Sequence, residues 1–173
     1  MSSLINKLLI SDRCYLSNVL ESDKDTIVKH LQEKSISDGT LTMPFPYTED
    51  DALAFINEYK NSKQQFMIRS SNDMLIGNIG VREHPTASHI GVLGYWLAKP
   101  LWSKGIMTEV VSKFTDFCFK DFKFERIVAS CYEHNIGSAR VLEKSGFTLE
   151  GLFIKHYKKN GTFYNGKMYG KVI

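Results

Sequence analysis

The sequence predicts a mixed α/β fold, in which one mostly antiparallel sheet holds a parallel pair of strands at its centre. Residues 90–153 run in the order strand, helix, strand, helix, strand, an order that joins parallel neighbours. Turn residues on either side of this centre, Ser-Asn-Asp at 71–73 and Asn-Gly at 160–161, predict antiparallel hairpins. Apolar residues at helical spacing between the strands predict helices that flank the sheet.

The N-terminal part predicts a strand over 13–20 and a helix over 23–33, with Ser22 placed to cap the free amides of that helix. A Pro-Phe-Pro sequence then excludes regular helix. Thr48 follows it and is expected to cap a second helix over 49–61, whose acidic first turn suits the helix dipole. The residues expected to face the core from this helix are Leu53, Phe55 or Ile56, and Tyr59.

Strands over 65–70 and 74–82 form the first predicted hairpin, and a further strand covers 90–98. A long helix over 104–120 follows. It carries an apolar stripe at helical spacing, which we interpret as core and not as a cofactor site. The stripe consists of Ile106, Val110, Phe114 and Phe117, with Met107, Val111 and Cys118 beside them.

The C-terminal part predicts a strand over 125–132 and a short helix over 135–145 that ends at Gly146, a residue type that tolerates the left-handed conformation common after helices. Asn160-Gly161 is the strongest two-residue hairpin signal in the chain. The last strands expected are 147–153, 154–158 and 163–172.

Composition favours one soluble, cytoplasmic domain covering residues 1–173. A chain of 173 residues that is 43% hydrophobic and 24% charged suits a single core. The net charge of +3 comes from basic residues spread along the chain, with one local cluster at 155–159, so a small-molecule site is favoured over nucleic-acid binding. No apolar run approaches the ~18 residues of a membrane span.

The cysteines carry no metal-binding signal. Cys14, Cys118 and Cys131 lack the spacing of metal ligands, and each lies among apolar residues. We therefore expect reduced, buried thiols and no metal site.

The segment YWLAKPLWSKGIMTEV, residues 95–110, passes from a predicted strand through a short turn into a helix. The turn Ser103-Lys104-Gly105 presents unpaired N–H groups at the positive end of the helix dipole, an arrangement that binds phosphate groups. Gly105 also lacks a Cβ that would hinder a ligand. The alternative is a plain turn with Ser103 as the helix N-cap. The spacing matches neither the P-loop nor the dinucleotide-binding motif.

A second motif lies in EHNIGSARVLEKSGF, residues 133–147. Together the two segments resemble the GNAT superfamily of acyl-CoA-dependent N-acetyltransferases, most closely its RimJ/RimL-like branch. The segment MPFPYTEDDA at 43–52 and the closing hairpin fit that branch as well, so the resemblance covers nearly the whole chain. The matching residues are Gly94, Tyr95, Trp96, Leu97, Trp102, Lys104, Gly105, Thr108, Glu109, Asn135, Ser138, Val141, Leu142, Glu143, Lys144, Gly146 and Phe147.

The resemblance implies a GNAT fold with a splayed parallel pair, and acetyl-CoA as co-substrate. The pantetheine arm would run beside Trp96, Leu97 and Ala98 and use their backbone groups. Asn135 would bind the arm and Lys144 would face the nucleotide phosphates; the alternatives are a helix N-cap and an exposed helix lysine. The pyrophosphate would bind at Ser103, Lys104, Gly105, Ile106, Met107 and Thr108.

Two residues depart from the superfamily's usual pattern. Met107 stands where Gly or Ala is usual, and its side chain either projects over the phosphates or turns into the apolar stripe, as helical register favours. Leu142 stands where many members carry a tyrosine that protonates the departing CoA thiolate. The resemblance gives that role to Ser138, which would touch the cofactor's sulfur. The alternative for Ser138 is a hydroxyl bonded to the carbonyl four residues earlier.

Attack on a thioester needs a neutral amine. At pH 7 an α-amine of pKa about 8 is roughly 10% neutral and a lysine about 0.04%, which favours an α-amine acceptor such as a protein N-terminus. Glu83, or His84 beside it, is the candidate base, and the alternative is a pair of solvated turn residues. A backbone N–H near Leu97 is the candidate oxyanion donor. The resemblance places on the acceptor side Tyr47, Glu49 and the hairpin over 154–165.

The sequence thus predicts acetyl transfer from acetyl-CoA to a primary amine, by a monomer or homodimer. One alternative is a non-catalytic CoA-binding protein of the same fold, which Met107 and Leu142 suggest. The other is a nucleic-acid-binding module, which the pI near 8.7 suggests.

Overall fold

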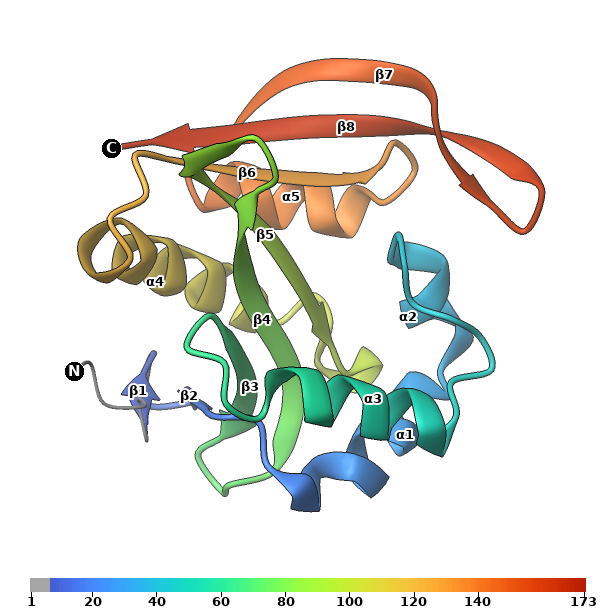
Figure 1. The fold of residues 1–173 in the computed structure, drawn as a ribbon, viewed down its shortest axis with the longest axis vertical. Helices are drawn as coiled ribbons and strands as arrows, with labels where there is room; N and C mark the ends of the chain where they lie inside the picture. The colour runs from blue at the N-terminus through green and yellow to red at the C-terminus, as the bar shows by residue number, and fades with distance from the viewer. Residues whose placement is uncertain (1–6) are drawn as a thin grey trace.

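One eight-stranded sheet organises residues 7–173, the part of the chain that the computed structural model describes (Figure 1). The sheet order is β1-β2-β3-β4-β5-β6-β8-β7, and all neighbours are antiparallel except β5 and β6. This confirms the predicted mixed α/β class. The elements are β1 Leu8–Leu9, β2 Cys14–Ser17, α1 Lys24–Leu31, α2 Lys34–Gly39, α3 Glu49–Tyr59, β3 Gln65–Ser70, β4 Leu75–His84, β5 Ala87–Leu97, α4 Ile106–Asp121, β6 Arg126–Tyr132, α5 Ile136–Lys144, β7 Thr148–Lys159 and β8 Thr162–Val172.

The parallel pair splays apart. Within the described residues, β5 and β6 pair only between 90–92 and 126–128, although β5 continues to Leu97. The N–H of Ala98 donates to the carbonyl of Ile76, toward β4. Because bonding direction alternates along a strand, the N–H and C=O groups of Tyr95 and Leu97 point away from β4, into the splay. A backbone edge without a strand partner therefore faces the space between β5 and β6, where the carbonyl of Leu97 accepts from the indole N–H of Trp102 at 2.7 Å.

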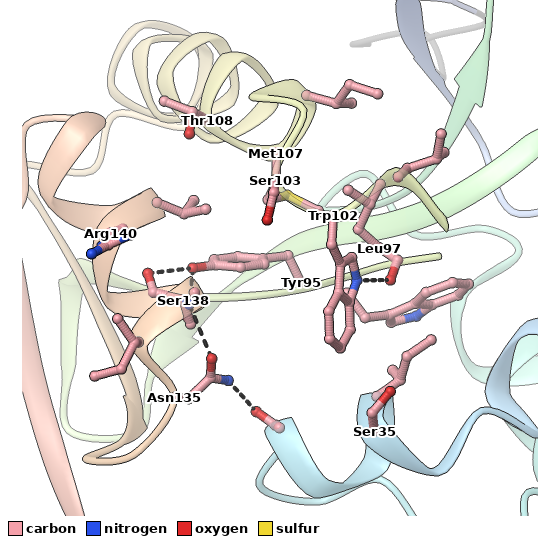
Figure 2. A pocket seen from close by; sticks show the side chains of 18 of the residues that line it. Ser35, Tyr95, Leu97, Trp102, Ser103, Met107, Thr108, Asn135, Ser138 and Arg140 are labelled. Atoms are coloured by element: carbon pink, nitrogen blue, oxygen red, sulfur yellow. Dashed lines mark hydrogen bonds between the residues drawn. The ribbon is translucent and has the colours of Figure 1, made fainter. Parts of the chain in front are cut away.

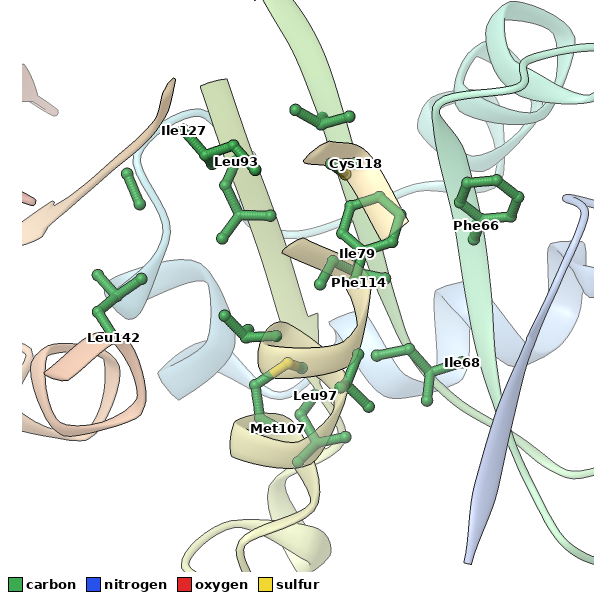
Figure 3. Close-up of a cluster of buried hydrophobic side chains, with 14 of the residues drawn as sticks. Phe66, Ile68, Ile79, Leu93, Leu97, Met107, Phe114, Cys118, Ile127 and Leu142 are labelled. Carbon is green, nitrogen blue, oxygen red and sulfur yellow. The ribbon is translucent and has the colours of Figure 1, made fainter. Parts of the chain in front are cut away.

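Each face of the sheet has its own core, because successive strand residues point to opposite sides. Phe66 and Ile68 of β3 pack with the apolar stripe of α4 (Figure 3), whereas Met67 packs with the helices α1 and α3. Of the stripe, Phe117 is partly buried and the other predicted members are buried, which confirms the stripe as core. None of the helices in residues 7–173 is long and apolar enough to cross a membrane.

Several local predictions are confirmed. The hydroxyl of Thr48 accepts from the N–H of Asp51 at 3.2 Å, and the Asp51 carboxylate accepts from the N–H of Thr48 at 2.8 Å, so α3 begins with a reciprocal cap. The turn residues Asn160 and Gly161 have φ of 50° and 82°, and Gly146 after α5 has φ of 85°. The three cysteines are buried and unpaired.

Other predictions are wrong. Ser22 does not cap α1, because a short 3₁₀ turn precedes that helix and the Asp23 carboxylate accepts from the N–H of Leu20 instead. Leu53 is 44% exposed, since Ala52 and Ile56 supply the buried side of α3. The strands expected over 147–153 and 154–158 are one strand, β7, whose pairing with β8 shifts register twice. The short helix α2 and strand β1 were not predicted.

Candidate active site

The turn before α4 leaves the first amides of the helix open. Gly105 takes the N-cap position with φ of 77°, and no side chain in the described residues caps this helix. Ser103 also has a positive φ, 62°, and stands two residues before the helix, so the interpretation of Ser103 as N-cap is wrong. The N–H groups of Ile106, Met107 and Thr108 begin the helix and have no intrahelical partner. The protein itself leaves room for a Cβ on Gly105, so glycine is required there by the left-handed backbone.

A cavity of about 790 Å³ lies between this turn, the end of β5, α2 and α5. Figure 2 shows Ser138 and Arg140 of α5 on one side of it and Ser103 and Trp102 of the turn on the other. The expected cofactor residues that line it are Trp96, Leu97, Ser103, Gly105, Ile106, Met107, Thr108, Asn135, Ser138 and Lys144.

Two expected cofactor residues lie outside this cavity. Ala98 is buried, and its N–H is used by β4. Lys104 turns its carbonyl toward the guanidinium of Arg13, which donates to it at 3.0 Å. Ala98 and Lys104 can therefore affect this cavity only by fixing the backbone beside it.

A second cavity, of about 620 Å³, is lined by residues of β4, β5 and β6 together with α1, α3 and the loop after α2. The residues that line both cavities are Gly39, Thr40, Tyr95, Trp96 and Ser138. The two cavities are therefore adjacent at these residues.

The expected acceptor-side residues divide between this second cavity and other places. Tyr47 lines it, whereas Glu49 lies outside and pairs with Lys24 at 2.7 Å. The hairpin over 154–165 lies outside both cavities. Glu83 is exposed on β4, also outside both, so the structure does not bring this candidate base to the site.

Ser138 forms a hydroxyl pair with Tyr95. The Oγ of Ser138 lies 2.8 Å from the hydroxyl oxygen of Tyr95, so Ser138 does not follow the alternative in which it bonds the carbonyl four residues earlier. Burial raises the pKa of Tyr95, which keeps its hydroxyl protonated at neutral pH. Leu142, where a catalytic tyrosine is usual, is fully buried in the core. The pair therefore places two hydroxyl groups at the junction of the two cavities.

Asn135 caps α5 and also joins two helices. Its Oδ1 accepts from the N–H of Ser138 at 3.0 Å, and its Nδ2 donates to the carbonyl of Gly39 at 2.9 Å. The N-cap interpretation is confirmed. The same side chain lines the first cavity and holds the end of α2, where Gly39 lines both cavities, against the start of α5.

Comparison with known proteins identifies the family. Residues 13–148 match the family described as the acetyltransferase (GNAT) domain. The chain belongs to the GNAT acetyltransferase family. It is 38% identical over 124 residues, 68% of either chain, to the probable N-acetyltransferase YjcK of Bacillus subtilis (strain 168). The predicted GNAT fold and N-acetyltransferase activity are thereby confirmed.

Solved GNAT structures have the same architecture. A GNAT-family acetyltransferase from Bacillus anthracis superimposes with a TM-score of 0.87 at 21% identity, over 96% of this chain and 98% of that one. RimL, a ribosomal L7/L12 α-N-protein acetyltransferase solved in complex with coenzyme A, gives a TM-score of 0.83 at 20% identity, over 96% and 98% of the two chains.

Sequence reasoning missed two groups of residues in this GNAT site. Arg140 lines the first cavity one helical turn before Lys144, and this spacing of four residues on one helix was an available signal. Residues of α2 and the loop after it line both cavities, and no periodic pattern marked them. Met107 is 5% exposed and packs in the core with Val111 and Cys118 (Figure 3), which confirms its expected orientation.

Proposed function

We propose that this GNAT protein transfers the acetyl group of acetyl-CoA to a primary amine by direct attack of the amine on the thioester. The observation that carries the proposal is the meeting of two cavities at Tyr95, Trp96 and Ser138. Direct transfer requires donor and acceptor to enter separately and to bring their reacting atoms together at one point.

The first cavity suits the donor. The uncapped amides at the start of α4 lie at the positive end of the helix dipole, and Arg140 and Lys144 add positive charge to the same cavity. Each charge-assisted hydrogen bond to a phosphate contributes about 1.5–3 kcal/mol, so several are needed against the cost of association. The backbone groups of Tyr95 and the N–H of Leu97 offer partners to the amide groups of a pantetheine arm, whereas the carbonyl of Leu97 already accepts from the indole N–H of Trp102 at 2.7 Å. The coenzyme A complex of RimL, a protein of the same fold, supports coenzyme A as the kind of ligand.

The chain supplies two groups for the chemical step. The N–H of Leu97 points into the splay and is the donor for the oxyanion that develops on the thioester carbonyl. Ser138 Oγ donates a hydrogen bond to the departing sulfur, and Tyr95 donates one to Ser138 Oγ. The proton that the amine loses on forming the amide goes to the thiolate, so both hydroxyl groups keep their protons. A thiol of pKa about 8.5 is a moderately good leaving group, so one hydroxyl donor is sufficient.

The acceptor we propose is an α-amine, such as a protein N-terminus. The candidate base Glu83 lies outside both cavities. Without help from a base only the neutral amine reacts, and at pH 7 the neutral fraction is about 10% for an α-amine and about 0.04% for lysine. The proposal treats residues 1–173 as one domain that acts in the cytoplasm as a monomer or homodimer. Three unpaired, buried cysteines suit a reducing compartment.

The test is acetyl transfer from acetyl-CoA to paired peptides, one with a free N-terminus and one with a blocked N-terminus and a single lysine. We expect thiol release and a mass gain of one acetyl group with the free N-terminus. The rate at limiting peptide should rise with pH up to about the acceptor's pKa of 8 and then level off. If calorimetry shows that coenzyme A binds but no amine causes thiol release from acetyl-CoA, the protein is a non-catalytic CoA-binding protein and the proposal is wrong.

A further inference from the structure

The ion pair between Arg13 and Glu109 lies outside the first cavity and contacts the turn at 103–105, which we call the phosphate turn. The guanidinium of Arg13, just before β2, donates from Nη1 to the carbonyl of Lys104 at 3.0 Å and from Nη2 to the Glu109 carboxylate at 2.5 Å. The hydroxyl of Ser11 donates to the other oxygen of that carboxylate at 3.0 Å. Lys104 stands between Ser103 and Gly105, the two residues with positive φ, so Arg13 holds the turn at its most constrained point.

This ion pair contributes little to the stability of the fold. Both side chains are 41% exposed, and exposed ion pairs typically contribute only about 0–1 kcal/mol to stability. The ion pair is distinguished by its position, because it joins the connection between β1 and β2 to the first turn of α4 across 96 residues of sequence.

Glu109 poses an electrostatic difficulty for an anion bound at the start of α4. It is the acidic residue of the first turn of this helix, and an unpaired carboxylate there competes with a bound phosphate for the helix dipole and repels it. The hydrogen bond from Arg13 lowers the pKa of Glu109, so the carboxylate stays ionised and paired. Arg13 thus cancels the negative charge nearest to the phosphate turn.

We propose that Arg13 is a positioning residue for the pyrophosphate of the donor: it fixes the carbonyl of Lys104, so that the amides of residues 106–108 face the cavity, and it neutralises Glu109. This inference rests on the proposed function. Neither Arg13 nor Glu109 lines the cavity, so both act through the turn.

The test separates phosphate binding from general damage by using two donors, acetyl-CoA and S-acetylpantetheine, which has no phosphate groups. For Arg13→Ala, kcat/KM with acetyl-CoA should fall about tenfold, the size of a partly buried charge effect at a helix end, while kcat stays within about twofold. With S-acetylpantetheine the variant should match the wild type. An equal loss with both donors, or no loss with acetyl-CoA, would overturn the inference.

Arg126→Ala is the matched control. Arg126 forms an ion pair with Glu150 of comparable exposure, on β6 and β7 and outside both cavities. Its kcat/KM should be unchanged with either donor, and the melting midpoints of the two variants should be similar. A loss specific to acetyl-CoA in this control would show that the effect does not belong to the turn.

The charge contribution is isolated by the double variant Arg13→Ala/Glu109→Gln. Removing the unpaired carboxylate should restore kcat/KM with acetyl-CoA to within about threefold of the wild type. If kcat/KM with acetyl-CoA stays as low as in Arg13→Ala, Arg13 does not act by neutralising Glu109. Calorimetry with coenzyme A distinguishes the two levels of the argument: wild-type protein that does not bind it contradicts the proposed function, whereas equal binding by wild type and Arg13→Ala contradicts only this inference.

Discussion

Single polar side chains at the junction of the cavities are held by neighbours from distant segments. Ser138 contacts Tyr95 through its side chain and Asn135 through its backbone N–H, and Asn135 in turn contacts Gly39. These hydrogen bonds fix the orientation of each side chain. The hydroxyl of Ser138 is therefore preorganised before substrate arrives.

At this scale we predict that Ser138→Ala lowers kcat more than it lowers affinity for coenzyme A. The hydrogen bond to sulfur strengthens as thiolate charge develops, so its loss falls on the transition state. We expect kcat to fall by about 10- to 100-fold. General acids typically contribute about 10²- to 10⁴-fold, and the loss here is expected at or below the lower end of that range because the thiol leaves readily. Tyr95→Phe, which leaves Ser138 in place, should cost less. The measurements are thiol release at saturating substrates and calorimetry with coenzyme A.

The control for this prediction is Ser112→Ala on α4, a helix serine outside both cavities. It should leave both quantities unchanged. Wild-type turnover in Ser138→Ala with a working acceptor would remove this serine from the chemical step.

Helix α4 combines two functions at its N-terminal end. Its first amides face the cavity, while Ile106 and Met107 of the same turn are 7% and 5% exposed and pack in the core. The apolar stripe therefore fixes the direction in which the amides point, because rotation of the helix would expose buried side chains.

At the element scale we predict that Met107→Ala destabilises the fold and hardly changes affinity for coenzyme A. Truncating a buried methionine leaves a cavity and should lower the free energy of unfolding by about 2–5 kcal/mol. Denaturant melts and binding titrations on the same sample measure both effects. Met74→Ala, at a residue that is 65% exposed, is the control and should stay within about 0.5 kcal/mol of wild type. Tighter binding without a lower midpoint would place Met107 over the phosphates.

At the scale of the whole molecule, a side-chain contact joins the C-terminal hairpin to α2 and the residue after it. The ammonium of Lys159, at the end of β7, donates to the carbonyls of Ser37 and Thr40, at 2.5 and 3.0 Å. A cation at the C-terminal end of a helix is favourable, although burial lowers the pKa of Lys159. Thr40 lines both cavities, so the hairpin supports the site without lining it.

At this scale we predict that Lys159→Met lowers the free energy of unfolding by about 1–3 kcal/mol, because the buried acceptors of Ser37 and Thr40 lose a charged donor. KM for both substrates should also rise, because Thr40, which lines both cavities, is then held less firmly. Lys113→Met, at an exposed position on α4, is the control and should change neither quantity. If Lys159→Met is destabilised but its KM values are unchanged, this contact contributes to stability alone.

Local patterns were sufficient for some elements and not for others. The cap at Thr48, the Asn160-Gly161 turn and strand β3, whose observed bounds match the prediction, depend on residues close together in sequence. Helix α2 has only six residues, KSISDG, with no apolar periodicity, and helices that short do not form on their own. Its last residues are held by Asn135 and Lys159, so tertiary contacts stabilise it.

The sequence by itself determined the family, the turn before α4 and the apolar stripe of α4, because each is set by residue types at fixed short spacing. Only the tertiary structure decided that two cavities meet at Ser138, that Glu83 lies apart from them, and that Arg13 contacts the turn. These features join segments from 43 to 96 residues apart. The physical reason is that the strand order and the splay of β5 from β6 decide which distant residues meet, and no local pattern encodes either.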